Sequence, residues 1–493
     1  MRIFTSTQGK LGEKSFLGVT YIEKVRLDPN CRDEITKTLR GLQEIYRTKP
    51  LLKKIQQVLQ KLIPGNVSLE EGRQGMDLWV IFLLGTLRLS CNWDYDKLKS
   101  CYDNHQKIRE IAGVDLFCDV DSVIGRQTIH DNVSLFTPEI ANDINKLVVD
   151  FGHNFLFPKE KELDIRCDSF VFETNVHFPT DFNLLKDSVR KTLSLGCNLA
   201  NEFNISGWRE TASQLNKFRK TYNCLSKMRH SNSQKEFQKE KRREEIKGAV
   251  RNYLKVAQAH LLKARVLYKH LGQEHPEFEL HMDYTELFIN QITRRVLNGE
   301  TIAPDEKVYS IFEPHTEWIC KGKAGVRQEL VVKVCIVEDQ FGFILNHRIM
   351  YKEQDRDIAF EITRDTQSLF PALRSISFDK GFYSKKDKEG NNNQSNIDKL
   401  NITAHLPVKG RRNKEAQERE GNERFIAARK QHPAVESAIN ALDSHGFDRC
   451  PDKGTPNFER YVAMAVSASN IHHIGAIIMA RELETKRRKK RSA

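Results

Sequence analysis

The sequence lacks the cysteine patterns that build disulfide frameworks or zinc sites. Its 10 cysteines are scattered over 493 residues, with no CxxC pair and no Cys/His cluster at zinc-ligand spacing. Separate thiols of this kind are typical of a chain kept in a reducing compartment. We therefore expect a cytoplasmic protein that is stabilised by hydrophobic cores rather than by cross-links.

Long apolar runs are also missing. The most apolar stretch, LWVIFLLGTLRL at 78–89, is shorter than the ~20 residues that a membrane span needs, and Arg88 interrupts it. The first residues, MRIFTSTQGKLGEK, contain no apolar segment ahead of a small-residue cleavage site. We expect a buried helix at 78–89, no secretory signal and no membrane partner.

Acidic residues are in the minority. Lys and Arg number 79 against 66 Asp and Glu, which gives a net charge of +13. An excess of cations favours a polyanionic partner, which is DNA, RNA or an anionic membrane surface, although many soluble proteins are basic for no specific reason. With 39% hydrophobic residues the chain is long enough for roughly two to four globular domains.

The sequence patterns of residues 1–155 predict helices. LLKKIQQVLQKLI at 51–63 carries apolar residues at helical spacing, and in LFTPEIANDINKLVVDFGH Thr137 is a plausible N-cap with Pro138 at the first helical position. Several short amphipathic helices in a basic protein fit either a helix-turn-helix module or a plain helical bundle.

Residues 183–300 form a second helical region. Its longest segment alternates charge signs and has an apolar stripe at Val250, Leu254, Ala257, Leu261 and Ala264. Two interpretations stay open: a solvated helical hairpin, or a surface that follows a phosphate backbone. The second interpretation makes these cations candidate DNA contacts: Lys241, Arg242 and Arg243. Trp208 is either a core indole or a platform for an unpaired base.

The sequence after residue 307 has the composition of β-strands. VYSIFEPHTEWI, RQELVVKVCIVED and FGFILNHRIMYK are β-branched and aromatic runs that predict consecutive antiparallel strands. The short run SISF then leads Asp379 onto a glycine turn, and HPAVESAINAL at 432–442 predicts a helix with Pro433 near its first position. The segment KRRKKR at 486–491 is a low-complexity basic tail.

Three acidic residues stand out against this background. Asp168 lies inside a predicted strand, Asp379 at the end of another, and Glu436 in the first turn of a helix. A carboxylate in a strand is costly unless a cation neutralises it, and oxygen ligands suit two Mg²⁺ or Mn²⁺ ions in phosphodiester chemistry. Taken singly, each acid also fits an ion pair, a turn or a helix N-terminus.

The motifs around these acids resemble a known family. DSFVFETNVHFPTDFNLLKDSVRK, VYSIFEPHTEWICKGKAG, SFDKGFYS and HPAVESAINALDSHGFDRCPDKG are similar, in this order, to segments of the DDE transposases of bacterial insertion sequences grouped as ISNCY. The resemblance runs from about Met76 to Ala480. It implies a transposase that cleaves the ends of its element and joins them to target DNA.

The resemblance also implies an architecture and a set of partners. It predicts an α/β ribonuclease H-like core, a mixed sheet flanked by helices, at 156–182 and 301–480. The helical region 1–155 would bind transposon ends, 183–300 would be a helical insertion, and 481–493 a basic tail. Asp168, Asp379 and Glu436 would hold two Mg²⁺ or Mn²⁺ ions. The partners would be double-stranded DNA and further copies of the chain, as a homodimer or higher oligomer.

Some neighbouring residues match the family less closely. A related DDE group surrounds its glutamate with Tyr-x2-Arg-x3-Glu-x6-Lys, whereas Arg429, His432 and Asp443 stand at those positions here. Residues that follow the first acid are expected to hydrogen-bond to the metal ligands: Asn175, His177 and Asp181. Cations in small glycine turns are candidate phosphate contacts: Lys321, Lys323, Lys409, Arg411 and Arg412.

Two other functions remain open at this point. A structure-selective nuclease would use the same ribonuclease H-like fold and the same metal chemistry without joining DNA strands. A non-catalytic DNA-binding repressor would need only the basic surface, and its carboxylates would be incidental.

Overall fold

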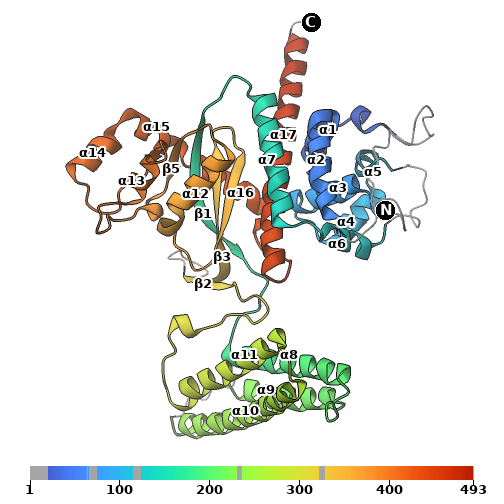
Figure 1. The fold of residues 1–493 in the computed structure, drawn as a ribbon, viewed down its shortest axis with the longest axis vertical. Coiled ribbons are helices and arrows are strands. Elements are labelled where there is room, and N and C mark those ends of the chain that lie inside the picture. Colours follow the sequence, from blue (N-terminus) through green and yellow to red (C-terminus); the bar gives the residue numbers. More distant parts are fainter. Residues whose placement is uncertain are drawn as a thin grey trace. The chain divides into compact units, whose positions relative to one another are not determined.

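The chain folds into two compact units. The computed structural model describes residues 20–63, 65, 75–114, 124–229, 236–320 and 328–491. One unit, here called the sheet unit, comprises Met1–Thr174 and Val331–Ala493, and the other, the helical unit, comprises Asn175–Leu330. Figure 1 shows both units and labels most of their helices and strands.

The fold is mixed α/β, with a mixed sheet of six strands flanked by helices. The order of the strands is β2-β3-β1-β5-β6, and β4 pairs with β3 outside this path. β1 runs antiparallel to β3 and parallel to β5, which is also parallel to β6, while β3 and β4 are antiparallel. The strands are β1 Leu163–Glu173, β2 Glu317–Cys320, β3 Gln328–Asp339, β4 Ile344–Met350, β5 Leu373–Phe378 and β6 Thr403–His405.

The apolar content of the strands explains their position in the sheet. From Val331 onward β3 is almost continuously aliphatic and most of it is buried, as expected of a strand covered on both faces. The runs predicted at 327–339 and 341–352 are confirmed as strands β3 and β4. Of the run predicted at 308–319, residues 317–319 are confirmed as part of strand β2. Residues 308–316 are not a strand, because the Ser310 hydroxyl accepts hydrogen bonds from the backbone N–H groups of Phe312 and Glu313 and closes a turn.

Helices before and after the sheet share one hydrophobic core with it. Those before it are α1 Ile35–Arg47, α2 Lys49–Leu59, α3 Leu78–Ser90, α4 Tyr95–Asn104, α5 Gln106–Ala112, α6 Arg126–Val133 and α7 Pro138–Leu156. Every residue of α3 is buried, which confirms the helix predicted at 78–89. Thr137 caps α7 by accepting a hydrogen bond from the backbone N–H of Ile140, as predicted.

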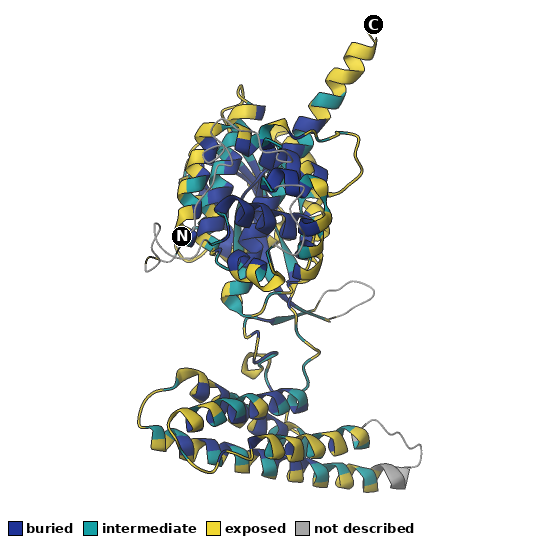
Figure 2. Cartoon of the chain, turned by 90° about the vertical axis from the view of Figure 1, so that its right-hand side faces the viewer, coloured by how far each residue is buried: buried dark blue, intermediate teal, exposed yellow. Residues whose placement is uncertain are grey.

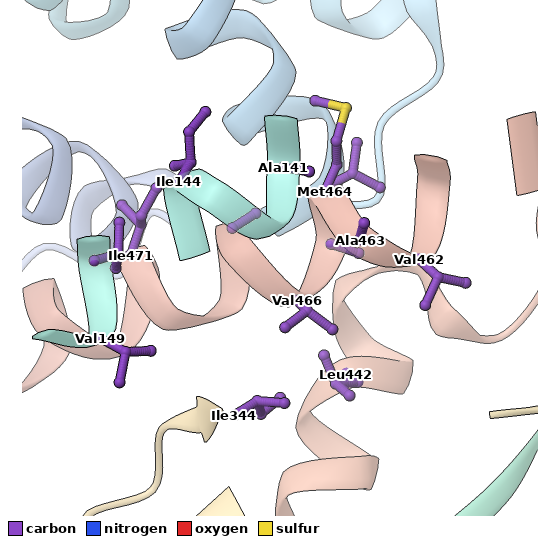
Figure 3. Close-up of a cluster of buried hydrophobic side chains, with 14 of the residues drawn as sticks. Ala141, Ile144, Val149, Ile344, Leu442, Val462, Ala463, Met464, Val466 and Ile471 are labelled. Carbon is purple, nitrogen blue, oxygen red and sulfur yellow. The ribbon is translucent and has the colours of Figure 1, made fainter. Parts of the chain in front are cut away.

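The longest helix, α17 (Thr455–Arg491), is the spine of this core. It packs against α1, α3 and α7, and Figure 3 shows Val466 and Ile471 of α17 in one apolar cluster with Ile144 of α7 and Ile344 of β4. Among the described residues it is the single helix long and apolar enough to cross a membrane. However, 72% of its apolar 18-residue stretch is buried inside the protein. That burial is what a core helix shows, so the fold is compatible with a soluble protein. Its basic end, 486–491, is an exposed continuation of the helix (Figure 2).

The remaining helices of the sheet unit lie between and after its strands. α12 contacts β4 and β5, and α16 contacts β1. They are α12 Asp355–Leu369, α13 Asn393–Asp398, α14 Lys414–Gly421, α15 Glu423–Gln431 and α16 Ala434–Leu442, with a short 3₁₀ turn η6 at Lys380–Phe382.

The helical unit has a core of its own. Its helices are α8 Asp181–Glu202, α9 Thr211–Arg229, α10 Glu236–Leu271 and α11 Pro276–Ile292. The predicted stripe from Val250 to Ala264 is buried in this core, so the region is a packed bundle rather than a solvated hairpin. Trp208 is 4% exposed and lies so close to Gly196 that a Cβ there would come within 2.6 Å of the indole. It is therefore a core residue, and its interpretation as a base platform is wrong.

Candidate active site

Asp168 and Asp379 lie on neighbouring parallel strands. β1 and β5 pair in a register that sets Cys167 opposite Phe378. Asp168 and Asp379 are the next residues along the chain, so Asp379, which follows the last residue of β5, comes beside Asp168 in the middle of β1. β1 lies between β3 and β5, which makes Asp168 a residue of an interior strand.

The end of β5 is held by the residues that precede α16. The Arg429 guanidinium donates a hydrogen bond of 2.7 Å to the carbonyl of Phe378, and His432 Nδ1 lies 3.0 Å from the Ser377 hydroxyl. Burial lowers the pKa of His432 to about 4, so its ring is neutral at physiological pH. Two positions that depart from the related family signature, Arg429 and His432, thus fix the strand that carries Asp379.

Glu436 lies in the first turn of α16. Val435 and Leu442 are fully buried and anchor this helix, while Glu436 itself is exposed. Because α16 contacts β1, its first turn presents Glu436 close to the strand that carries Asp168. Asp379 and Glu436, far from Asp168 in the sequence, lie near enough to it for their charges to raise its pKa.

The neighbouring carboxylates affect the pKa of Asp168. Burial raises the pKa of Asp168 to about 6, and the negative charges of Asp379, Asp355 and Glu436 act in the same direction. A hydrogen bond of 2.8 Å from the backbone N–H of Ser169 to Asp168 Oδ1 opposes the rise. Mutual repulsion of carboxylates is the condition that a bound cation relieves.

Asp355 is a fourth acid at this place, which the sequence analysis missed. It is the first residue of α12, and its Oδ1 accepts a hydrogen bond of 2.7 Å from the Ser169 hydroxyl. Lys333 Nζ of β3 lies 3.5 Å from the same oxygen. A Cβ on Gly381, two residues after Asp379, would come within 2.9 Å of Asp355 Oδ2. In the sequence an acid at a helix start is indistinguishable from an ordinary N-terminal preference.

The donor set suits hard divalent cations. All four groups offer carboxylate oxygens, which Mg²⁺ and Mn²⁺ prefer, and Asp379 and Glu436 are exposed to solvent. Among the described residues no three His, Cys, Asp or Glu side chains are already gathered to hold an ion as they stand.

A cavity elsewhere in the sheet unit is separate from the acids. It measures about 380 Å³ and is lined by residues that include Lys146, His153, Phe157 and Phe370, at the beginning of β1. Asp168 is near the middle of that strand and is not among the lining residues. The acids are thus outside this cavity, and two of them, Asp379 and Glu436, are exposed to solvent.

The other described residues predicted for the site lie in the helical unit or on the surface of the sheet unit. In the helical unit Asp181 pairs with Arg295 at 2.9 Å, and His177 lies 3.5 Å from Asp187. Asn175 is exposed. Lys409, Arg411 and Arg412 are also exposed, and Arg412 pairs with Glu420 at 3.0 Å. The predicted contacts Lys321 and Lys323 lie outside the described residues.

The comparisons with known proteins add no relative. No family model, no curated protein and no solved structure matches this chain. The assignment of a function therefore depends on the residues and on their geometry.

The raised pKa of Asp168 leads to a prediction about stability in metal-free buffer. The folded state favours the protonated carboxyl, whose pKa is about 6 against the ordinary value of 3.8. Ionisation of Asp168 therefore costs stability as pH rises from about 4 to 6, and the cost persists above that range. Asp168→Asn cannot ionise and keeps an oxygen for the Ser169 N–H. It should be more stable than wild type at pH 7.5, by at most about 3 kcal/mol, and equal to it near pH 4.

Thermal unfolding in EDTA at these two pH values measures the difference. An equal gain at pH 4 and 7.5 would show that the effect is one of packing rather than of charge. A loss of stability at pH 7.5 would contradict the electrostatic description of the site.

Proposed function

We propose that this protein is a DNA transposase whose sheet unit is a ribonuclease H-like catalytic core. The observation that carries the proposal is the convergence of Asp168, Asp379 and Glu436 from an interior strand, the end of its parallel neighbour and a helix that contacts that strand. A ribonuclease H-like sheet collects two divalent ions with acids in this arrangement. The motif resemblance supports the same three residues.

The strand order agrees with this core. Apart from β2, the strands run β4-β3-β1-β5-β6, with antiparallel pairing from β4 to β1 and parallel pairing from β1 to β6. The first acid is on the strand where the pairing changes from antiparallel to parallel. Because β1 and β5 are parallel and in register, the second acid, directly after the end of β5, comes next to the first, in the middle of β1.

The residues of the site would hold the reacting groups without forming a covalent bond to DNA. Bound to Asp168, Asp379 and Glu436, two Mg²⁺ or Mn²⁺ ions would activate the attacking oxygen and stabilise the leaving oxygen. In the first step water attacks a phosphorus at the element's end, the bond to the 3′ oxygen breaks, and that oxygen takes up a proton. In the second step the freed 3′-hydroxyl attacks a target phosphorus in line, and the target's own 3′ oxygen leaves.

The neighbouring side chains would keep the ligands in place. Asp355 holds the Ser169 hydroxyl beside Asp168, and Lys333 balances part of the charge of Asp355. Arg429 and His432 fix the end of β5, so that Asp379 leaves the strand at a defined point. Such support matters because a catalytic carboxylate displaced by 1 Å loses much of its effect.

The proposed partners follow from the chemistry. The substrates are the double-stranded DNA of the transposon ends and of the target, and two ends are joined at once, which calls for a homodimer or higher oligomer on DNA. The net charge of +13 and the exposed basic end of α17 favour a polyanion. The proposed location is the cytoplasm, at the nucleoid.

The experiment that tests the proposal uses the purified full-length protein and labelled duplexes that carry the ends of its own element. We expect nicking at the element boundary in Mg²⁺, no nicking in EDTA, and transfer of the labelled strand into a target plasmid. Cleavage without strand transfer would identify a nuclease instead. Specific end binding with no cleavage in Mg²⁺ or Mn²⁺ would identify a repressor.

A further inference from the structure

The charges of the helical unit are separated between its helices. Every charged residue of α9 is cationic: Lys217, Arg219, Lys220, Lys227 and Arg229. After Glu245 the charged residues of α10 are also all cationic, whereas those of α11 are all acidic: Glu277, Glu279, Asp283 and Glu286. Among the described helices α9 and α11 each pack against both α8 and α10, and they do not form a packed pair with one another. They therefore lie at opposite corners of the bundle, one basic and one acidic.

The cations of α9 point away from the bundle core. Phe218 and Leu225 are 1% exposed and mark the inner face of the helix. Lys220 and Lys227 each follow one of them by two residues, which turns them to the opposite side, and both are exposed. Lys217 and Arg219 are exposed as well.

The facing part of α10 adds two more cations at the same level. Arg242 of α10 donates a 2.9 Å hydrogen bond to the carbonyl of Met228, and Phe218 stacks on Tyr253 with ring centroids 4.9 Å apart. These contacts fix the antiparallel register of the two helices. In that register Arg251 and Lys255, both exposed, lie level with Lys217 and Lys220 of α9.

Several other cations of the bundle are already engaged. Lys247 pairs with Glu244, Arg265 with Glu286 and Lys191 with Glu277, while Lys263 lies 4.2 Å from the centroid of Trp208. By contrast, no ion pair within the described part of the chain involves the outward cations of α9 and α10, namely Lys217, Arg219, Lys220, Lys227, Arg251 and Lys255. This group, called the α9–α10 basic face below, concentrates like charges that repel each other unless a polyanion covers them.

We propose that the α9–α10 basic face binds the phosphate backbone of duplex DNA outside the catalytic site. The identity of the polyanion rests on the proposed function, and the charge argument does not. Duplex DNA offers about one negative charge per 1.7 Å of axis, which matches a row of cations along a helix. An anionic membrane would require apolar side chains among the cations. No large exposed apolar residue is described in α9, and the two described in α10, Leu262 and Val266, lie beyond Lys255 toward the C-terminal end of that helix.

Of the predicted DNA contacts Lys241, Arg242 and Arg243, the middle one is engaged inside the hairpin. Arg242 binds the carbonyl of Met228 at the end of α9 through both Nε and Nη2, so its role is to close the hairpin. The basic face is therefore centred on α9, and the best test replaces α9 residues.

The test measures the binding of full-length protein to duplex DNA over a range of salt concentrations in EDTA. Lys217→Gln, Lys220→Gln and Lys227→Gln combined should lower the slope of log affinity against log salt by roughly two to three units, at about 0.9 per phosphate contact. Gln keeps the helix propensity, and a Lys→Arg triple at the same positions should keep the wild-type slope. The charge-matched control replaces the engaged cations Lys191, Lys247 and Arg265 with Gln.

The two triples separate the possible outcomes. A drop in slope for the α9 triple alone, with recovery in its Arg version, supports the basic face. An unchanged slope, or an equal drop in the control triple, overturns it. Loss of binding to phosphatidylserine vesicles with unchanged DNA binding also overturns it, in favour of a membrane surface. Because EDTA removes catalysis from the measurement, failure here is distinct from failure of the proposed strand cleavage.

Discussion

Single replacements at the acidic site should stop strand cleavage and leave DNA binding intact. Asp168→Asn, Asp379→Asn and Glu436→Gln each keep the size of the side chain and remove an anionic oxygen ligand. A divalent ion contributes several kcal/mol to a phosphodiester transition state, so the cleavage rate should fall by about a thousandfold or more. Affinity for end DNA should stay within roughly threefold, because cations supply the phosphate contacts.

A carboxylate outside the site provides the matched control. Asp365 lies in α12, the helix that begins with Asp355, and pairs with Arg364 at 2.9 Å on the surface. Asp365→Asn should cleave at nearly the wild-type rate, since exposed ion pairs contribute little. Gel-based single-turnover cleavage measures all four variants, and near-normal cleavage by any one of the three site variants would remove that residue from the proposed site.

The second large effect concerns the contact between α1 and α17. A Cβ on Gly475 of α17 would lie 1.8 Å from the carbonyl oxygen of Lys37, and one on Gly41 of α1 would lie 2.1 Å from the carbonyl oxygen of Ile471. The two backbones therefore approach too closely for any side chain. Gly475→Ala must push the helices apart within a packed core, which should lower the free energy of unfolding by roughly 2–4 kcal/mol.

The same substitution at Gly248 gives the opposite expectation. Gly248 is an exposed residue of α10, and a Cβ there would meet nothing within 4 Å. Gly248→Ala should stabilise the helical unit by about 0.5–1 kcal/mol, because alanine favours a helix more than glycine does. Thermal unfolding of both variants tests the prediction. Wild-type stability in Gly475→Ala would mean that α1 and α17 do not cross as described.

Local patterns in the sequence were enough to predict several elements of the fold. The aliphatic runs of β3 and β4, the buried helix at 78–89 and the cap at Thr137 follow from side-chain periodicity and from capping chemistry. The strand predicted at 308–319 was wrong over 308–316, because a serine hydroxyl closes a turn there, and a turn of this kind has little effect on the hydrophobic pattern.

Long-range packing was not readable from periodicity. The sequence presented 1–155 as a separate helical region, whereas its helices share a core with the sheet through α17. The length of α17 was not foreseen either, because its apolar first half and basic end look like unrelated segments. Contacts between distant parts of a chain depend on complementary surfaces, which no local window contains.

The candidate site, like the fold, could be predicted only in part from the sequence. Asp168, Asp379 and Glu436 could be proposed from the sequence because each has a recognisable setting and because the surrounding motifs resemble a family. The role of Asp355 needed the structure, since its proximity to Ser169 and to Gly381 arises only when α12 packs beside β1 and β5. The hydrogen bonds from Arg429 and His432 to the end of β5 could not be predicted from the sequence either.

Binding of Mn²⁺ to the full-length protein tests the central claim most directly, because it asks whether the three acids form one metal site. The free ion can be followed by electron paramagnetic resonance during a titration at pH 7.5. We predict saturable binding by wild type and by Asp365→Asn, and its loss in Asp168→Asn, Asp379→Asn and Glu436→Gln. Identical Mn²⁺ binding by wild type and by the three site variants would contradict the account.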